Sequence, residues 1–123
     1  MLLLQTKRVY EPVEVTDGKR ILVDRLWPRG VAKETACIDE WLKDLAPSTE
    51  LRKWFAHEPT RFEEFRSSYL DELRNNSAAQ VQALQIIQWA EEEQVTILFA
   101  AKDSQHNNAV VLKGFLLGMW KKK

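Results

Sequence analysis

The stretch from Val95 to Ala101 constrains the fold more than any other part of the sequence. It is almost continuously apolar and rich in β-branched residues, and charged residues follow it directly. Such a run is typical of a strand that is covered on both faces, as in a parallel sheet. The segment from Asn108 to Trp120 is apolar nearly all round, which predicts a helix packed largely against that sheet. We therefore expect residues 95–101 to form a central strand.

Two further strands are predicted near the N-terminus. They cover residues 2–10 and 20–24, and the turn signal Thr16-Asp17-Gly18-Lys19 separates them. The segment from Ala36 to Leu45 leaves two possibilities open, because its apolar spacing fits a helix while residues 37–39 also suit a brief strand.

Three helices are predicted in the middle of the chain, each with a starting signal. Ser48 is a suitable N-cap for a short helix. Pro59 suits the first turn of a second helix, whose inward residues recur at spacings of three and four: Phe62, Phe65, Tyr69 and Leu73. Ser77 with Gln80 has the form of a capping box that opens a third helix through about Glu93, with these residues facing inward: Val81, Leu84 and Ile87.

Length and composition fit one domain. With 123 residues and 45% hydrophobic composition, the chain can bury one core, and we expect a single domain over residues 1–123. The order of strands and helices predicts an α/β fold of three layers, with a small, mostly parallel sheet flanked by helices.

The cysteine count and the N-terminal sequence bear on the compartment. Cys37 is the single cysteine, so it forms no intramolecular disulfide, and we expect a small buried side chain in a reducing environment. The first residues lack the features of a secretory signal, and no apolar run reaches the length of a membrane span. These features predict a cytoplasmic protein without a membrane segment, and they do not predict an oligomeric state.

Acidic and basic residues balance over the whole chain but not along it. There are 18 of each, so no overall field attracts polyanions. The first and last parts are basic and the middle is acidic. If the two ends meet in space they form a positive patch, which keeps nucleic-acid binding open as a less favoured alternative to ordinary solvated charge. The terminal lysines, Lys121 to Lys123, are expected to favour the negative end of the last helix.

The segment that joins the central strand to the last helix is the first candidate site. It reads Lys102-Asp103-Ser104-Gln105-His106-Asn107-Asn108. The backbone amides and the dipole at a helix start favour phosphate or carboxylate, and Lys102 adds a full charge. The alternative is structural: Asp103 or Ser104 caps the helix, while His106 and Asn107 satisfy buried polar groups.

The second candidate site follows the strand at residues 20–24. Arg25 and Arg29 lie there beside Trp27, and planar guanidinium groups bind oxyanions bidentately. If this strand is parallel to the central one, both loops emerge at the same edge of the sheet, where open α/β sheets bind ligands. An arginine would then face His106. The alternative is that Asp24 pairs with an arginine and Trp27 belongs to the core.

Several types of site are not supported by the sequence. It has no phosphate-binding glycine loop of the Walker or dinucleotide type, no Gly-x-Ser-x-Gly elbow and no metal-ligand spacing such as His-Glu-x-x-His. We therefore expect neither a cofactor nor a metal. His57 suits acid–base chemistry, but a histidine at a helix end can also simply cap carbonyls.

Four ordered motifs resemble the YeaO-like branch of a bacterial domain-of-unknown-function family. They are Val23-Asp24-Arg25-Leu26-Trp27-Pro28-Arg29-Gly30-Val31, Trp41-Leu42-Lys43-Asp44-Leu45-Ala46-Pro47-Ser48, Leu51-Arg52-Lys53-Trp54-Phe55 with His57 and Pro59, and Ala100-Ala101-Lys102-Asp103 with His106-Asn107-Asn108-Ala109. The resemblance covers nearly the whole chain and implies an α/β domain with no established substrate, cofactor or reaction. The wider superfamily often has a cysteine at the corresponding strand end and a Cys-His-Arg element near the helix start. This chain has His106-Asn107-Asn108 there, which argues against thiol chemistry.

The favoured hypothesis is a site for an anionic small molecule, either a binding site or an enzyme of unnamed reaction. Arg25 and Arg29 would hold the anion and Lys102 would neutralise charge. His106 and Asp103 are the candidate catalytic residues, with His106 as the proton carrier, and Asn107 or Asn108 would orient the ligand. Two other hypotheses remain: a nucleic-acid-binding module, and a protein-interaction domain that uses the aromatic residues of segment 54–69.

Overall fold

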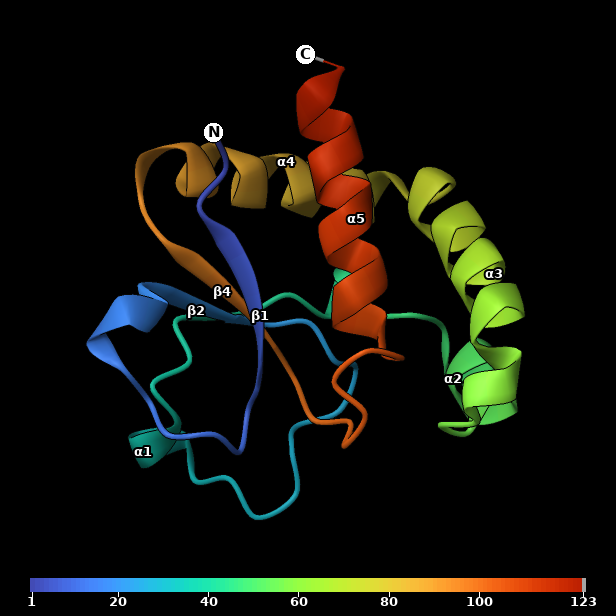
Figure 1. Ribbon diagram of the computed structural model, residues 1–123, viewed down its shortest axis with the longest axis horizontal. Coiled ribbons are helices and arrows are strands. Elements are labelled where there is room, and N and C mark those ends of the chain that lie inside the picture. The colour runs from blue at the N-terminus through green and yellow to red at the C-terminus, as the bar shows by residue number, and fades with distance from the viewer. Residues whose placement is uncertain (123) are drawn as a thin grey trace.

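Four parallel strands form the centre of the computed structural model, which describes residues 1–122 (Figure 1). Their order in the sheet is β1-β4-β2-β3, and all three pairings are parallel. The bounds are β1 Leu4–Arg8, β2 Lys19–Leu22, β3 Glu40–Trp41 and β4 Val95–Phe99. Every residue of β4 is buried, so the prediction of a central, doubly covered strand is confirmed.

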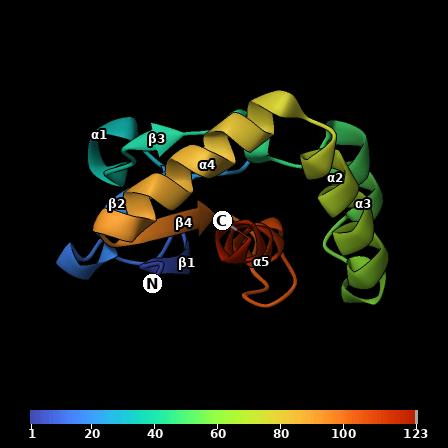
Figure 2. The same ribbon diagram turned by 90° about the horizontal axis from the view of Figure 1, so that it is seen from above.

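Five α-helices and three short 3-10 helices complete the described chain. They are α1 Lys33–Ala36, α2 Thr49–Phe55, α3 Phe62–Arg74, α4 Ser77–Glu92, α5 Asn108–Lys121, η1 Val15–Asp17, η2 Lys43–Leu45 and η3 Pro59–Arg61. The helix α5 runs alongside β1 and β4, α4 crosses the end at which the strands begin, and α2 and α3 lie farther from the sheet (Figures 1 and 2). The predicted α/β class is correct.

The two faces of the sheet bury different clusters. Alternate strand residues such as Ile97 and Phe99 join the main core, which takes most of its other members from helices α2 to α5. On the opposite face, Leu98 and Leu22 pack with a smaller cluster that includes Trp27. Helices therefore cover one face, while short elements and loops between residues 9 and 41 cover the other.

Polar residues also lie within that second face. The buried carboxylate of Asp17 pairs with Lys7 Nζ at 3.0 Å and with Arg20 Nη1 at 2.5 Å. Arg20 also donates to the carbonyl oxygens of Ala36 and Cys37. This network ties β1, η1, β2 and the end of α1 together.

Local capping and spacing predicted α2 and α3 correctly. The Oγ of Ser48 accepts a hydrogen bond from the N–H of Leu51 at 3.1 Å, as an N-cap should. In α3, three of the four residues predicted to face inward are buried, and the fourth is partly buried against the core: Phe65, Tyr69 and Leu73, then Phe62.

The start and the inward face of α4 differ from the prediction. Asn76 is the N-cap, because its side chain accepts from the N–H of Ala79 at 3.2 Å. Val81 and Leu84 are 66% and 46% exposed, although Ile87 is buried as expected. The buried face is made mostly of small residues that permit close approach of neighbouring elements: Ala79, Ala83, Ile86, Ile87 and Ala90.

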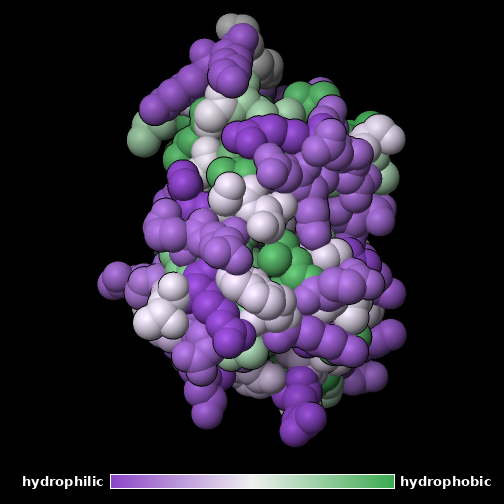
Figure 3. Space-filling model, turned by 90° about the vertical axis from the view of Figure 1, so that its right-hand side faces the viewer, coloured by the Kyte–Doolittle hydropathy of each residue, from purple (hydrophilic) through white to green (hydrophobic). Residues whose placement is uncertain are grey.

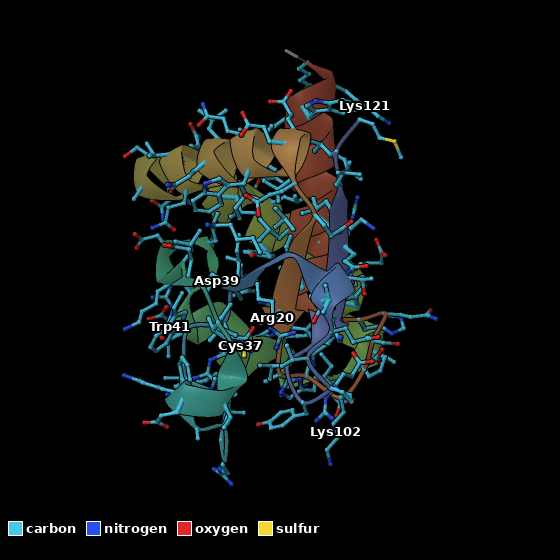
Figure 4. All side chains as sticks on the ribbon, turned by 90° about the vertical axis from the view of Figure 1, so that its left-hand side faces the viewer. Arg20, Cys37, Asp39, Trp41, Lys102 and Lys121 are labelled. Atoms are coloured by element: carbon cyan, nitrogen blue, oxygen red, sulfur yellow. The ribbon has the colours of Figure 1, made fainter. Side chains whose placement is uncertain are left out.

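The segment from residue 36 to 45 is neither of the predicted alternatives. It contains the end of α1, the two-residue strand β3 and the turn η2. Cys37 is the C-cap of α1 in a left-handed conformation with φ 52°, and it is exposed. The expectation of a buried cysteine is therefore wrong, because this residue ends a helix at the surface beside Arg20 (Figure 4).

The basic residues of the last part of the chain are spread over the molecule. Lys121 is in the last turn of α5, as predicted, while Lys123 lies outside the described residues. Figure 4 shows Lys121 and Lys102 at opposite ends of the molecule. No helix within residues 1–122 has the length and apolarity that a membrane crossing requires.

Candidate functional site

A cavity of about 810 Å³ lies at the carboxyl ends of the strands. Its walls come from the segments that follow β1, β2 and β4, from α2 and α3, and from the start of α5. All strands are parallel, so their carboxyl ends meet at one edge of the sheet. The two polar loops predicted to meet therefore do share one cavity.

Six of the seven predicted site residues line this cavity: Arg25, Arg29, Lys102, Asp103, Asn107 and Asn108. His106 is not among the lining residues. Five further charged or titratable side chains do line it without having been predicted as ligand-binding residues: Arg8, Tyr10, Asp24, Arg52 and His57.

His106 pairs with Asp103 beside the cavity. Its Nδ1 lies 2.9 Å from Oδ2 of Asp103, and its ring packs edge-on against Phe62 at a centroid distance of 5.0 Å. The Asp103 carboxylate also accepts from the backbone N–H groups of Gln105 and His106. The Gln105 N–H, with His106 as a further donor, lowers the pKa of Asp103. These contacts build a turn before α5, so the expected proton carrier does not face the cavity.

The two asparagines hold the framework of the site. Oδ1 of the buried Asn107 accepts from the N–H of Val110 at 3.0 Å, which makes it the N-cap of α5, and its Nδ2 donates to the carbonyl of Asp103. Nδ2 of Asn108 donates to Oδ1 of Asp24 at 3.0 Å. Asn107 therefore has a structural role, but it caps α5 in place of the predicted Asp103 or Ser104, and Asn108 positions a neighbouring carboxylate.

Asp24 joins three segments at the cavity wall. Besides Asn108 it binds the N–H of Ala100 through Oδ2 at 2.9 Å. Burial raises the pKa of the Asp24 carboxyl, although these two hydrogen bonds and the charges of His57 and Arg52 oppose the rise. Asp24 forms no ion pair with an arginine among the described residues. Trp27 packs beside the smaller core cluster, as one sequence alternative proposed.

The segment before α2 is held by side chains from three directions. Arg25 donates through Nε to the carbonyl of Pro47 at 3.1 Å and through Nη2 to that of Ala46 at 3.3 Å. The hydroxyl of Tyr69 donates to the carbonyl of Leu45. Glu72 accepts from both the N–H and the Oγ of Ser48. These bonds fix the direction of α2, which carries Arg52 into the cavity wall.

Arg52 has a buried polar atom without a partner. Its Nε is buried and makes no hydrogen bond within residues 1–122. A buried N–H donor that lacks an acceptor carries the full cost of desolvation, so such atoms are rare, and an anion or a water at this wall would supply the acceptor. Of the cavity-lining cations, Arg52 is the one whose guanidinium group most needs an acceptor.

Arg8 lies across the cavity from α2. It donates through Nε to the carbonyls of Ala100 and Ala101, and its guanidinium group lies 4.6 Å from the centre of the Tyr10 ring. The Tyr10 hydroxyl donates to the carbonyl of Arg29 at 2.8 Å. Arg29 and Lys102 are exposed and form no ion pair within the described residues.

Sequence reasoning missed Arg8 and Arg52 for a geometric reason. Neither follows an inner strand directly, and each reaches the cavity through pairing between distant parts of the chain. The position of Arg8 at the end of the first predicted strand was the one available signal for it. No group of three or more metal-ligating side chains occurs among residues 1–122.

Comparison with known proteins agrees with the sequence motifs. A family model described as "Inactive DUF488-N3 subclade" matches residues 3–123. The chain belongs to this DUF488-N3i family. The uncharacterized protein YeaO of Escherichia coli (strain K12) is 44% identical over 113 residues, which are 92% of this chain and 96% of YeaO. The resemblance to YeaO-like proteins is thereby confirmed.

Mycobacterial relatives share a shorter region. The uncharacterized protein Rv3073c of Mycobacterium tuberculosis (strain ATCC 25618 / H37Rv) is 48% identical over 75 residues, which are 61% of this chain and 64% of that protein. The uncharacterized protein Mb3100c of Mycobacterium bovis (strain ATCC BAA-935 / AF2122/97) has the same identity and coverage. No solved structure matched the chain.

Proposed function

We propose that the cavity binds a small anionic molecule through a phosphate or carboxylate group, without converting it chemically. The observation that carries the proposal is the partnerless Nε of Arg52, a buried donor in the wall of an open cavity. An oxyanion offers the charge-assisted acceptor that this donor lacks. Arg25 lies in the same wall with its guanidinium group held by backbone carbonyls.

The choice of binding over catalysis rests on two points. His106, the expected proton carrier, lies beside the cavity and is engaged by Asp103. The matching family model is described as inactive. The binding role needs only positive charge, open volume and a rigid frame, and the hydrogen bonds around Asp24 and before α2 supply that frame.

The other two hypotheses draw less support. The aromatic residues of segment 54–69 are mostly core, since Phe55, Phe65 and Tyr69 are buried. Figure 3, which faces the side of α3, shows mainly hydrophilic surface with small separate hydrophobic areas. Nucleic-acid binding is less favoured because the chain has no net positive charge and Lys121 lies at the opposite end of the molecule from the cavity residue Lys102.

The proposal is tested by titrating the protein calorimetrically with inorganic phosphate and pyrophosphate. The wild-type protein should show saturable binding. Arg52→Gln removes one charged hydrogen-bond donor and should weaken binding by roughly ten- to a hundredfold, which corresponds to about 1.5–3 kcal/mol.

Lys53→Gln is the matched control, because Lys53 is the next residue of the same helix, is exposed and does not line the cavity. It should bind the probe as the wild type does. Equal affinities of the Arg52→Gln and wild-type proteins, or no saturable binding of either probe, would refute the proposed site. Phosphorus NMR of a bound phosphate monoester should show the ester intact, and its hydrolysis would refute the non-catalytic role.

A further inference from the structure

The cations around the cavity fall into two groups on opposite walls. The helix wall is defined by Arg52 of α2 and by Arg25, which follows β2 and whose side chain donates to the carbonyls of Ala46 and Pro47 just before α2. The sheet wall is defined by Arg8, Arg29 and Lys102, which lie at or after strand ends. Both ribbon views show α2 well apart from the end of β1, with the loops after β2 and β4 between them (Figures 1 and 2).

Different contacts hold the two walls, although Arg25 and Arg29 belong to the same loop after β2. The helix wall is held through the carbonyls of Ala46 and Pro47. The sheet wall is held through Tyr10, whose ring lies under the Arg8 guanidinium group and whose hydroxyl binds the Arg29 carbonyl. No side chain of one wall contacts the other among the hydrogen bonds and ring contacts of the described residues.

A carboxylate lies between the two walls. Asp24 binds the N–H of Ala100, and the carbonyl of that same residue accepts from Arg8. On its other side Asp24 interacts electrostatically with Arg52 and His57. When ionised, Asp24 repels an anion bound beside it, so the favoured places for anionic groups are at the cations of the two walls.

The cavity lining also includes apolar side chains that suit an uncharged chain or ring: Leu26, Trp27, Pro28 and Ala101. The volume of about 810 Å³ is that of a site for a drug-sized molecule and exceeds what a single phosphate fills. One inorganic anion would leave most of the wall without a contact.

We infer that the ligand of this cavity is a two-ended dianion: one anionic group at the helix wall, a second at the sheet wall, and an uncharged segment between them. This inference rests on the proposed function and adds to it the chemical class of the ligand. The second anionic group binds within the same molecule, so its effective concentration is high once the first group is bound.

The test compares alkane-α,ω-bisphosphonates of increasing chain length with alkane monophosphonates of the same length, by calorimetric titration of the full chain. The affinity of the bisphosphonates should pass through a maximum at the length that spans the two walls. There it should exceed that of the matched monophosphonate by about tenfold or more. If the alkane chain contributes only apolar contacts, longer chains should raise the affinities of both series equally, without a difference between bisphosphonate and monophosphonate.

Substitutions show which wall binds each anionic group of the ligand. Arg52→Gln should weaken both series, while Arg29→Gln should weaken the bisphosphonate of optimal length by a clearly larger factor than its monophosphonate. Arg29 is exposed and its side chain makes no hydrogen bond within residues 1–122, so the variant should fold. Arg61→Gln, which alters a surface arginine outside the lining, is the control.

The failures of the two proposals are distinguishable. Equal affinities of bisphosphonates and monophosphonates at every length, with a loss in Arg52→Gln, would overturn the two-ended ligand and leave the anion site intact. Equal effects of Arg29→Gln on both series would also overturn it. No binding of any phosphonate would overturn both proposals.

Discussion

At the scale of single residues, Asp24 has the most consequences for binding. It braces the ends of β2 and β4 and the start of α5, and it places a carboxyl with a raised pKa in the cavity wall. When ionised it repels an anionic ligand. When protonated it does not, so the affinity for anions depends on its protonation state.

The affinity for sulfate should therefore rise as the pH falls through the raised pKa of Asp24. Sulfate keeps its charge over this range, so the change belongs to the protein. Asp24→Asn should bind sulfate more tightly at neutral pH and should lose this part of the pH dependence. His57 also lines the cavity, so both proteins are compared in a His57→Gln background, by calorimetric titration. Identical pH profiles with and without Asp24 would contradict the prediction.

From the sequence, the candidate site was predictable for those residues that directly follow a strand. Arg25 and Arg29 follow β2 and Lys102 follows β4, and parallel strands bring such residues to one edge. Arg52 was not predictable in this way, because its position depends on hydrogen bonds that hold the segment before α2. The direction of the His106 ring was likewise not predictable, because it is determined by a contact with Phe62 of α3.

At the scale of elements, the backbone before α2 depends on one buried hydroxyl. Tyr69 is fully buried and donates to the carbonyl of Leu45. Tyr69→Phe leaves that carbonyl without its donor and should lower the free energy of unfolding by about 1–3 kcal/mol. Tyr10→Phe is the matched control, because Tyr10 also donates to a carbonyl but is exposed, so water replaces the bond. Urea unfolding of both variants measures the difference, and equal losses would contradict the argument.

The corrected start of α4 gives a second test at this scale. Asn76→Ala removes the N-cap and should lower the free energy of unfolding by about 1 kcal/mol, whereas Ser77→Ala should change it little. Thermal or urea unfolding distinguishes the two variants. The opposite order would restore Ser77 as the cap.

Elements that the neighbouring sequence indicates, through a cap or an apolar run, were predicted. The buried face of a helix was not predicted where packing against distant parts of the chain determines it. Ser48 caps α2 through a hydrogen bond with Leu51, three residues further along the chain. The apolar run that begins at Val95 itself indicates a buried strand. The inward face of α4 is instead determined by packing against neighbouring elements, where alanine permits close approach. Hydrophobicity alone therefore placed Val81 and Leu84 inside, although the structure exposes them.

At the scale of the whole molecule, the two sides of the sheet have different chemistry. The helix side is an apolar core that carries the cavity at one end. The other side contains the buried ion network of Asp17 with Lys7 and Arg20. Burial of Asp17 favours a higher pKa, but the hydrogen bonds from Lys7, the Glu14 N–H and Arg20 outweigh it and hold the pKa below its usual value.

Asp17→Asn should lower the free energy of unfolding at neutral pH by about 3 kcal/mol, because the buried Arg20 loses its counter-ion and the partly buried Lys7 keeps only Glu14. The stabilisation by Asp17 is fully present above the usual aspartate pKa and is lost as the pH falls through the lowered value. The variant should therefore lose less stability than the wild type on acidification. Asp71→Asn alters an exposed pair with Arg74 and should have little effect. Urea unfolding at neutral and acidic pH measures all three proteins.

The central position of β4 also affects how the chain is made. β1 and β2 do not pair with each other. Each pairs with β4, which begins only at Val95, so these pairings cannot form until β4 has been synthesised. During synthesis, most of the polypeptide leaves the ribosome before the middle of the sheet exists, so two strand edges stay open to other chains. We expect nascent chains that end before Val95 to remain sensitive to protease and to recruit chaperones, and protection to appear only once β4 and α5 have emerged.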